Sequence, residues 1–455
     1  MSAALDVARV DGVFTIERFA TEIDRLNAAS RRPNAFSSAA FLESYALRNE
    51  YHVPGSGERL FLVRERGRVI GCAPMRLSAE RVTPSLGPLA VCASRLDFLA
   101  SADTEQLQFL CAPEDEARVS AAVIGHLCER EPGWGLLELV GQPPGGALHR
   151  AVHAMTGRRF WARDIEVQPF TEVPLIWSDL KDYFRSLTKH MRSNVGRQAR
   201  RLYATGQTEL VLARGGVEVN AWFDAYCDLD ARSWKGGTES SIARSPRRVR
   251  LYREIAQGRA GFDPSFVGVI LDGVLVAGLL VGSNETASRE RHGAWCLEMA
   301  YDRSRADLGP GQLLLLLAVG EALARRDGFL NFLQNFAYYK HRWGAAALNV
   351  VNLQLLRRFS LHDGRARVGD LRHWWLARKE AKAAKGAASV VAALSPEPTK
   401  EHPEPSAAVP GAALGVDWAH ARRLTAAAFA ASGSGSGLRV LDRAAARSYL
   451  PFDLE

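Results

Sequence analysis

Side chains able to bind phosphate or move protons concentrate in four segments between residues 183 and 344. The first, residues 183–202, reads YFRSLTKHMRSNVGRQARRL and is expected to be helical. At 3.6 residues per turn, the basic side chains fall on one side of this helix or beside it: Lys189, Arg192, Arg197, Arg200 and Arg201. Such a helix can hold phosphate groups through charge-assisted hydrogen bonds. The alternative is a solvated basic helix face.

The second segment places an aromatic ring and an amine at the end of a predicted helix over 219–232. Trp234 and Lys235 follow that helix and are themselves followed by two glycines. Both side chains are candidates for holding a substrate. The alternative is a buried tryptophan at a helix terminus, with the lysine interacting with the carbonyl end of the helix dipole.

The third segment is a predicted strand near 295–301, a glycine-rich turn, and a helix over 312–326. Glu298 lies toward the end of the strand and is a candidate proton acceptor; the alternative is a strand carboxylate paired with a local arginine. Glycines allow close approach of a ligand to the backbone, and the free amides of a first helical turn suit a pyrophosphate. Four residues of the turn are candidates for this contact: Arg305, Gly309, Gly311 and Gln312. Many α/β loops carry glycine, so this pattern alone is also compatible with a structural turn.

The fourth segment follows a predicted strand over 330–333. It gathers polar-tipped aromatic residues and cations within a few positions: Tyr338, Tyr339, Lys340, Arg342 and Trp343. That density is unusual for a purely structural loop and favours a binding or catalytic role.

Composition limits the classes of binding partner and the cellular compartment that suit this chain. The 455 residues are 47% hydrophobic and carry a net charge of +8, which favours phosphate-bearing cofactors, RNA or acidic membrane surfaces. Six cysteines occur singly without a CxxC pair, and the N-terminus lacks a signal-peptide pattern, so we expect a cytoplasmic protein. Only eight of the 58 basic residues are lysines, so a lysine here suggests a need for a compact charge or an amine.

Neither a metal site nor a membrane span is expected. The histidines are scattered, and His292 and His341 lack partners at ligand spacing. The most apolar stretch, 266–282, is interrupted by Asp272 and Gly273, which is typical of a hairpin turn between two strands.

The chain is predicted to form two similar α/β regions and a tail. Residues 13–167 and 168–378 show the same order of hairpin, helix and strand, and Gly67 aligns with Gly273 in the two hairpins. Internal duplication explains this order, and chance agreement of common α/β patterns is the alternative. Residues 379–455 are rich in Ala and Pro and are expected to be a linker and tail whose end docks on the body or on a partner.

Together the four segments resemble the GNAT-superfamily acyltransferases of the FemAB-like and CelD-like (cellulose-biosynthesis-associated) type. The matching motifs lie at 186–202, 230–236, 310–314 and 339–343. The resemblance implies two tandem GNAT-like folds, each an α/β unit with a mixed sheet, and acetyl-CoA or another acyl-CoA as co-substrate. The usual phosphate loop of the superfamily fits residues 305–311 only with one extra residue, and Pro310 there lacks an amide.

The resemblance also implies a reaction, in which an amine acceptor attacks the acyl-CoA thioester directly. In this hypothesis Glu298 is the base and Tyr339 protonates the leaving thiolate. The donor phosphates or an acidic acceptor are held by further cations: Lys235, Lys340, Arg342, Arg192, Arg197 and Arg201. The acceptor is a small molecule or a glycan or peptide precursor.

Two other functions remain open at this point. One is an aminoacyl transfer from charged tRNA, for which the basic helix and positive charge are suited. The other is a non-catalytic binding module built on a duplicated acyltransferase fold.

Overall fold

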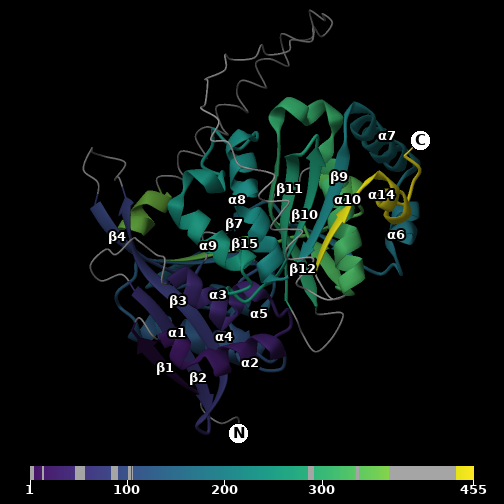
Figure 1. Ribbon diagram of the computed structural model, residues 1–455. Coiled ribbons are helices and arrows are strands. Elements are labelled where there is room, and N and C mark those ends of the chain that lie inside the picture. Colours follow the sequence, from purple (N-terminus) through teal and green to yellow (C-terminus); the bar gives the residue numbers. More distant parts are fainter. Residues whose placement is uncertain are drawn as a thin grey trace, which may run out of the picture.

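The computed structural model forms two α/β halves, each built around its own mixed sheet (Figure 1). The N-terminal half, purple and blue in Figure 1, lies below the teal and green C-terminal half. The structure describes the following residues: 5–12, 15–46, 57–82, 91–100, 104, 106–284, 292–334, 338–367 and 437–454. The prediction of two tandem α/β units is confirmed.

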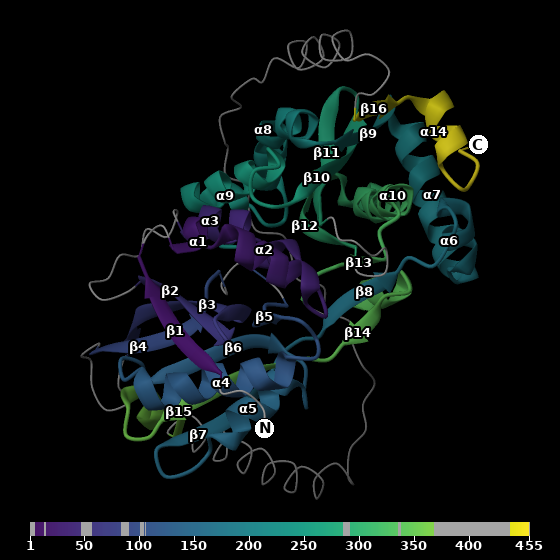
Figure 2. The same ribbon diagram turned by 90° about the horizontal axis from the view of Figure 1, so that it is seen from below.

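The first sheet has strand order β1-β2-β3-β4-β6-β15-β7, with β5 beside β3. Its strands are β1 Asp6–Asp11, β2 Gly57–Glu65, β3 Arg68–Val82, β4 Val91–Phe98, β5 Leu110–Cys111, β6 Leu136–Gln142, β7 Phe160–Glu166 and β15 Val351–Arg357. Its helices are α1 Thr15–Arg18, α2 Ala20–Ala29, α3 Ala39–Ala46, α4 Glu116–Arg130 and α5 Ala147–Ala154. Helices α4 and α5 cover the outer face, and α1 to α3 lie toward the second half (Figure 2).

The second sheet has strand order β14-β8-β13-β12-β11-β10-β9-β16. Its strands are β8 Phe170–Pro174, β9 Thr208–Arg214, β10 Asp263–Leu271, β11 Val274–Ser283, β12 Gly293–Tyr301, β13 Phe329–Asn331, β14 Ala346–Leu348 and β16 Leu438–Leu441. One face packs against α8 Gly216–Arg232 and α9 Pro246–Ala256. The other packs against α6 Leu180–Ser186, α7 Lys189–Thr205, α10 Pro310–Arg325 and α14 Arg443–Tyr449 (Figure 2).

The two halves repeat one topology. In the first, the hairpin β2–β3 leads to β4, then α4, then β6 parallel to β4. In the second, the hairpin β10–β11 leads to β12, then α10, then β13 parallel to β12. Gly67 and Gly273 occupy the two hairpin turns with φ of 82° and 80°, a conformation that favours glycine. This equivalence supports internal duplication.

One strand from the predicted second half joins the sheet of the first half, which the sequence analysis did not anticipate. The segment Val351–Arg357 falls in the predicted second domain, but as β15 it pairs antiparallel with both β6 and β7 of the first sheet. The predicted second domain, 168–378, thus contains a strand that pairs within the first sheet. Its alternating burial fits either sheet, so its pattern alone does not indicate which sheet it joins.

The end of the tail docks on the body. Strand β16 pairs with the edge strand β9, and α14 buries apolar side chains against the α6–α7–α10 layer. Those most fully buried are Ala446, Leu450 and Leu454. The linker residues before 437 lie outside the described residues. No helix within the described part of the chain is long and apolar enough to cross a membrane.

The basic segment 183–202 forms parts of two helices instead of one. Leu187 is extended and ends α6, and the Thr188 hydroxyl accepts a hydrogen bond from the Met191 amide at 3.2 Å to begin α7. The hairpin expected over 266–282 is confirmed as β10 and β11.

Candidate functional site

The two parallel strands at the centre of the second sheet separate soon after they begin. Strand β12 pairs with β13 only through Gly293–Trp295, opposite Phe329–Asn331. Among the described strands, the remainder of β12 pairs only with β11. The backbone of Cys296–Tyr301 is therefore open on the side where β13 leaves the sheet.

Strand β12 also carries a β-bulge at this opening. Leu280 of β11 pairs with Glu298, and the next residue Val281 pairs with Cys296, so Leu297 is the extra residue. A bulge disrupts the ladder locally and re-aims the side chains beside it. Leu297 and Glu298 are adjacent in sequence, yet Leu297 packs in the core cluster beneath α8 and α9, and Glu298 contacts residues of the same layer.

Glu298 is the centre of a buried ion-pair cluster. Its side chain is 7% exposed and pairs with two cations, Lys235 and Arg248. The Lys235 ammonium contacts one carboxylate oxygen, and an Arg248 guanidinium nitrogen donates to the other at 2.6 Å. Two predicted site residues, Glu298 and Lys235, are therefore in contact. Both carboxylate oxygens of Glu298 are paired with a cation in this structure.

Two polar atoms beside this cluster have no hydrogen-bond partner among the described residues. They are the Tyr226 hydroxyl and Asp230 Oδ1, one turn apart on α8. Burial raises the pKa of Tyr226 well above its usual value, and the nearby charge of Glu298 adds to this effect. Buried polar groups are normally paired, so a polar ligand group or a water molecule would satisfy these two atoms.

The loop after α8 presents Trp234 to solvent above the cluster. Its side chain is 47% exposed, and the Lys235 ammonium lies 5.8 Å from its ring centroid. Ser233 bridges to Asp302 at the end of β12, which fixes the loop beside the open strand. The alternative of a buried Trp234 is therefore wrong: an exposed aromatic ring beside buried charges is suited to contact a substrate.

The turn before α10 is tightly packed. Gly309 has a φ of 65°, and a Cβ there would lie 2.4 Å from Cδ of Gln198 on α7. The Gln312 amide already donates to the Gly309 carbonyl at 3.1 Å. The side-chain oxygens of Gln198 and Gln312 are buried without partners among the described residues. The turn therefore offers fewer free backbone amides than predicted, and the two unpartnered side-chain oxygens are hydrogen-bond acceptors, which do not bind phosphate.

Helix α11, Tyr338–Arg342, follows β13 and carries the predicted acid. Burial raises the pKa of Tyr339, and the neighbouring Cys296 and Tyr301 add to the shift. The phenol therefore keeps its proton at neutral pH and remains able to donate it. Arg342, at the end of α11, is half-buried.

Lys340, predicted to hold donor phosphate or an acidic acceptor, contacts the backbone of the chain itself in this structure. Its side chain is buried, and its ammonium donates to the carbonyls of Phe332, Leu333 and Gln334. These bonds tie α11 to the end of β13. We therefore treat Lys340 as a residue that positions Tyr339.

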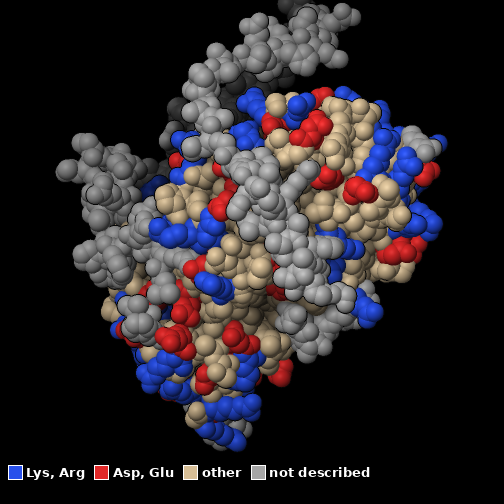
Figure 3. Space-filling model, viewed as in Figure 1, with Lys and Arg blue, Asp and Glu red and all other residues tan. Residues whose placement is uncertain are grey.

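Most arginines predicted to bind phosphate on α7 contact the protein itself. Arg192 donates to the carbonyls of Arg185 and Leu187 at the end of α6. Arg201 pairs with Asp307 in the turn before α10, and Arg197 donates to Asn194. Arg305 is exposed in the same turn. On the face in Figure 3 basic and acidic side chains are mixed, and basic ones gather along the edge where Figure 1 shows α6 and α7.

Sequence reasoning missed Arg248 and Tyr226, and it included Asp230 only as the first residue of the motif at 230–236, without a role. Arg248 lies on α9, whose sequence PRRVRLYREIA holds four arginines. No feature of this sequence indicates that Arg248 is the one that pairs with Glu298. Tyr226 and Asp230 stand at i and i+4 of a predicted helix, and that spacing was the available signal.

Comparison with known families identifies the second half. Residues 189–341 match the model of the acetyltransferase (GNAT) domain. The comparison with curated proteins found no significant match. The match spans the basic helix, the Trp234–Lys235 loop, the open strand β12 and the turn before α10.

Solved structures share the fold at low sequence identity. The crystal structure of FemX is 12% identical with a TM-score of 0.51, covering 76% of this chain and 96% of that chain. A tandem GNAT protein from the clavulanic acid biosynthesis pathway is 14% identical with a TM-score of 0.43, covering 78% and 98%. Saccharomyces cerevisiae N-myristoyltransferase with bound myristoyl-CoA is 12% identical with a TM-score of 0.38, covering 78% and 79%. The family match places a GNAT acetyltransferase domain at residues 189–341, and the repeated topology together with the likeness to FemX shows a fold of two tandem α/β units.

Proposed function

We propose that this chain is an N-acyltransferase that moves an acyl group from acetyl-CoA or another acyl-CoA directly to an amine. The observation that carries the proposal is the separation of β12 from β13 next to the turn before α10. An extended thioester arm lying in this opening would meet the free backbone of Cys296–Tyr301. Backbone amides at a bulge can stabilise the oxyanion that forms during acyl transfer.

In this proposal the donor phosphates lie at the start of α10. The Gly311 amide and the Nε2 groups of Gln198 and Gln312 are the donors proposed there, because the backbone amides of Gly309 and Gln312 already donate to Ala306 and Gly309. Arg305 is exposed in the same turn and can add a charge-assisted bond. Tyr339 protonates the leaving thiolate, because its raised pKa keeps the proton on the phenol until a base forms.

The acceptor amine enters from the α8–α9 side. Trp234 provides an exposed ring, and the unpartnered Asp230 and Tyr226 oxygens provide polar contacts. Glu298 removes the amine proton once the acceptor displaces Lys235 from its carboxylate. An acidic group on the acceptor gives Lys235 and Arg248 a replacement partner, so we favour acceptors that carry both an amine and an acid.

Thermal stabilisation and thiol release test the donor. Acetyl-CoA and longer acyl-CoAs should raise the Tm, and free thiol should appear only when an amine is added from a panel of amino sugars, amino acids and short peptides. Trp234→Ala is the matched control: it should raise the KM for the amine while leaving the Tm shift by acyl-CoA unchanged, because its ring lies on the acceptor side. No Tm shift with any acyl-CoA would contradict the proposal.

Two outcomes would identify the alternatives. Binding of aminoacyl-tRNA that weakens steeply with salt indicates a tRNA-dependent transferase. Binding of neither donor indicates a non-catalytic module. We place the reaction in the cytoplasm as part of the proposal, supported by buried free thiols at Cys72, Cys111 and Cys128, which suit a reducing compartment.

A further inference from the structure

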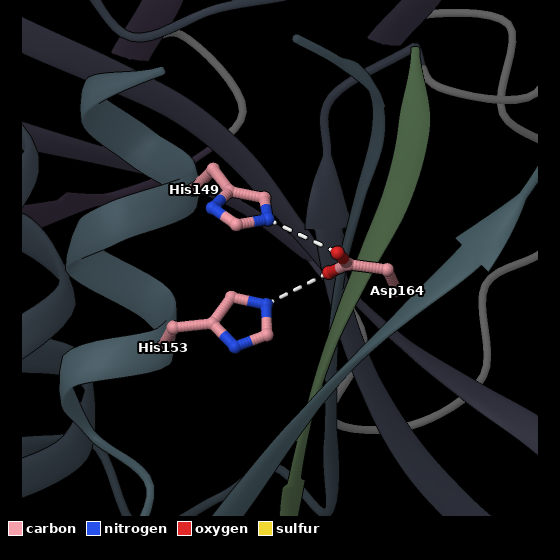
Figure 4. Close-up of side chains that lie close together, drawn as sticks. All are labelled: His149, His153 and Asp164. Atoms are coloured by element: carbon pink, nitrogen blue, oxygen red, sulfur yellow. Dashed lines mark hydrogen bonds and ion pairs between the residues drawn. The ribbon is translucent and has the colours of Figure 1, made fainter. Parts of the chain in front are cut away.

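Three metal-ligand side chains meet on the outer face of the first half, outside the matched residues 189–341. His149 and His153 are four residues apart on α5, so both imidazoles lie on one face of that helix. Asp164 lies on β7, the edge strand of the first sheet. Figure 4 shows both imidazoles pointing from α5 toward the Asp164 carboxylate.

The ligand atoms are already close together. His149 Nε2 lies 3.0 Å from Asp164 Oδ2, and His153 Nε2 lies 2.7 Å from Oδ1. One ligand atom from each residue lies within 4.8 Å of the other two. The rings are stacked with centroids 4.4 Å apart, which holds both Nε2 atoms on the same side. Small side-chain shifts are enough to place an ion about 2 Å from all three atoms.

We propose that His149, His153 and Asp164 bind a divalent transition-metal ion of the zinc class. Two imidazole nitrogens and one carboxylate are ligands suited to Zn²⁺, whereas Mg²⁺ and Ca²⁺ prefer oxygen ligands alone. The sequence analysis predicted no metal site, and this cluster is the reason for proposing one.

The chemistry of the donors fits this assignment. Burial works against ionisation of Asp164, but hydrogen bonds from His153 and His149 outweigh it and lower the pKa of the carboxyl. Asp164 is therefore a carboxylate at neutral pH and supplies one negative charge. Without a metal, Nε2 carries the proton that is donated to Asp164; when an ion binds, the neutral imidazole carries its proton on Nδ1 instead, and bonds from Nε2 to the ion replace the two hydrogen bonds.

The site is open to solvent and joins two elements. The three side chains are between 19% and 37% exposed, so an ion can enter without unfolding. Three protein ligands leave a fourth tetrahedral position for water or for a group from a ligand. A bound ion would link α5 to the edge strand β7, and the folded first half would gain stability from it.

Metal titration of the full chain, freed of any histidine tag and stripped with a chelator, tests the proposal. We expect one Zn²⁺ per chain by calorimetry and a rise in Tm on saturation. Co²⁺ should give the intense visible absorption of a tetrahedral site. Loss of an outer-shell partner already costs about 10–100-fold in affinity, so His153→Ala and Asp164→Ala should each weaken binding by at least about 100-fold.

His190→Ala is the matched control, because His190 is an exposed histidine on α7 outside the cluster. Its Zn²⁺ affinity should equal that of the wild-type chain. Circular dichroism establishes that each variant is folded, and the cobalt spectrum of the wild-type chain does not depend on any variant. A spectrum matching that of aqueous Co²⁺, or equal Zn²⁺ binding by a His149→Ala/His153→Ala double variant, would overturn the proposal.

Discussion

Replacing Glu298 by glutamine should weaken the fold as well as the reaction, because its carboxylate neutralises two cations in the interior. The side chains of Glu298, Lys235 and Arg248 are 7%, 10% and 20% exposed. The amide of glutamine keeps the shape but removes the negative charge, which leaves two cations facing each other. Breaking a buried pair by removing one partner costs about 3–5 kcal/mol, and we expect about 3 kcal/mol here.

A second substitution separates charge from packing. Lys235→Met keeps the length of the side chain and removes one cation. In the Glu298→Gln/Lys235→Met double variant only Arg248 remains charged, so part of the penalty disappears. We therefore expect the double variant to be more stable than the sum of the single effects predicts, by at least about 1 kcal/mol.

Asp224→Asn is the matched control for this cycle. Asp224 pairs with Arg253, so this pair also joins α8 to α9, but the Asp224 side chain is 79% exposed. Solvent screens such a pair, and its loss should cost less than about 1 kcal/mol.

Urea unfolding followed by circular dichroism measures each free energy of unfolding. Thiol release is then measured at a temperature where every variant is folded. A Glu298→Gln effect no larger than that of Asp224→Asn, or additive effects in the double variant, would refute the ion-pair reasoning. Wild-type turnover in folded Glu298→Gln would remove Glu298 from the proposed mechanism.

Three further outcomes follow from the structure. Tyr339→Phe should lower the rate of thiol release by about 10²–10⁴-fold with an unchanged Tm, because only the phenolic proton is lost; an unchanged rate would exclude it as the acid. Burial raises the pKa of Asp327 to about 7, so the folded chain binds a proton that the unfolded chain has lost above about pH 4. Stability should thus fall as pH rises from about 4 to 7, and Asp327→Asn should flatten the dependence of Tm on pH; parallel curves would contradict this. Deleting 437–454 should lower the Tm and promote association, because it uncovers the edge of β9 and the surface under Leu450 and Leu454; an unchanged Tm would count against tail docking.

Much of the fold could be predicted because the relevant signals are local. Asp272-Gly273 and Gly67 mark hairpin turns whose positive φ demands such residues. The long apolar run of α10 is buried on nearly all sides, which its sequence of consecutive leucines indicates. The exchange of β15 into the first sheet depends on long-range pairing, and no local pattern specifies it.

The candidate site was only partly predictable for a similar reason. Glu298 and Lys235 were predicted with separate roles, and the fold joins them across a distance of many residues. The scarcity of lysine was informative, because Lys235 and Lys340 are both buried. The Lys235 ammonium contacts the Glu298 carboxylate, and the Lys340 ammonium donates to backbone carbonyls. The spacing of His149 and His153 on a helix was also readable, but Asp164 follows from tertiary structure alone.

In the proposed reaction, strand β12 lies between the acyl donor and the acceptor amine. Its open edge would therefore be the place where the two meet. Cys296 and Tyr301 pack with the α10 side of the sheet, whereas Glu298 contacts the α8–α9 side. In the proposed reaction, a donor bound at the start of α10 would therefore lie across the sheet from an acceptor held near Glu298. Continuous pairing of β12 with β13 would close the passage between them. The early separation of the two strands, together with the bulge at Leu297, is the geometric requirement for a direct transfer through this sheet.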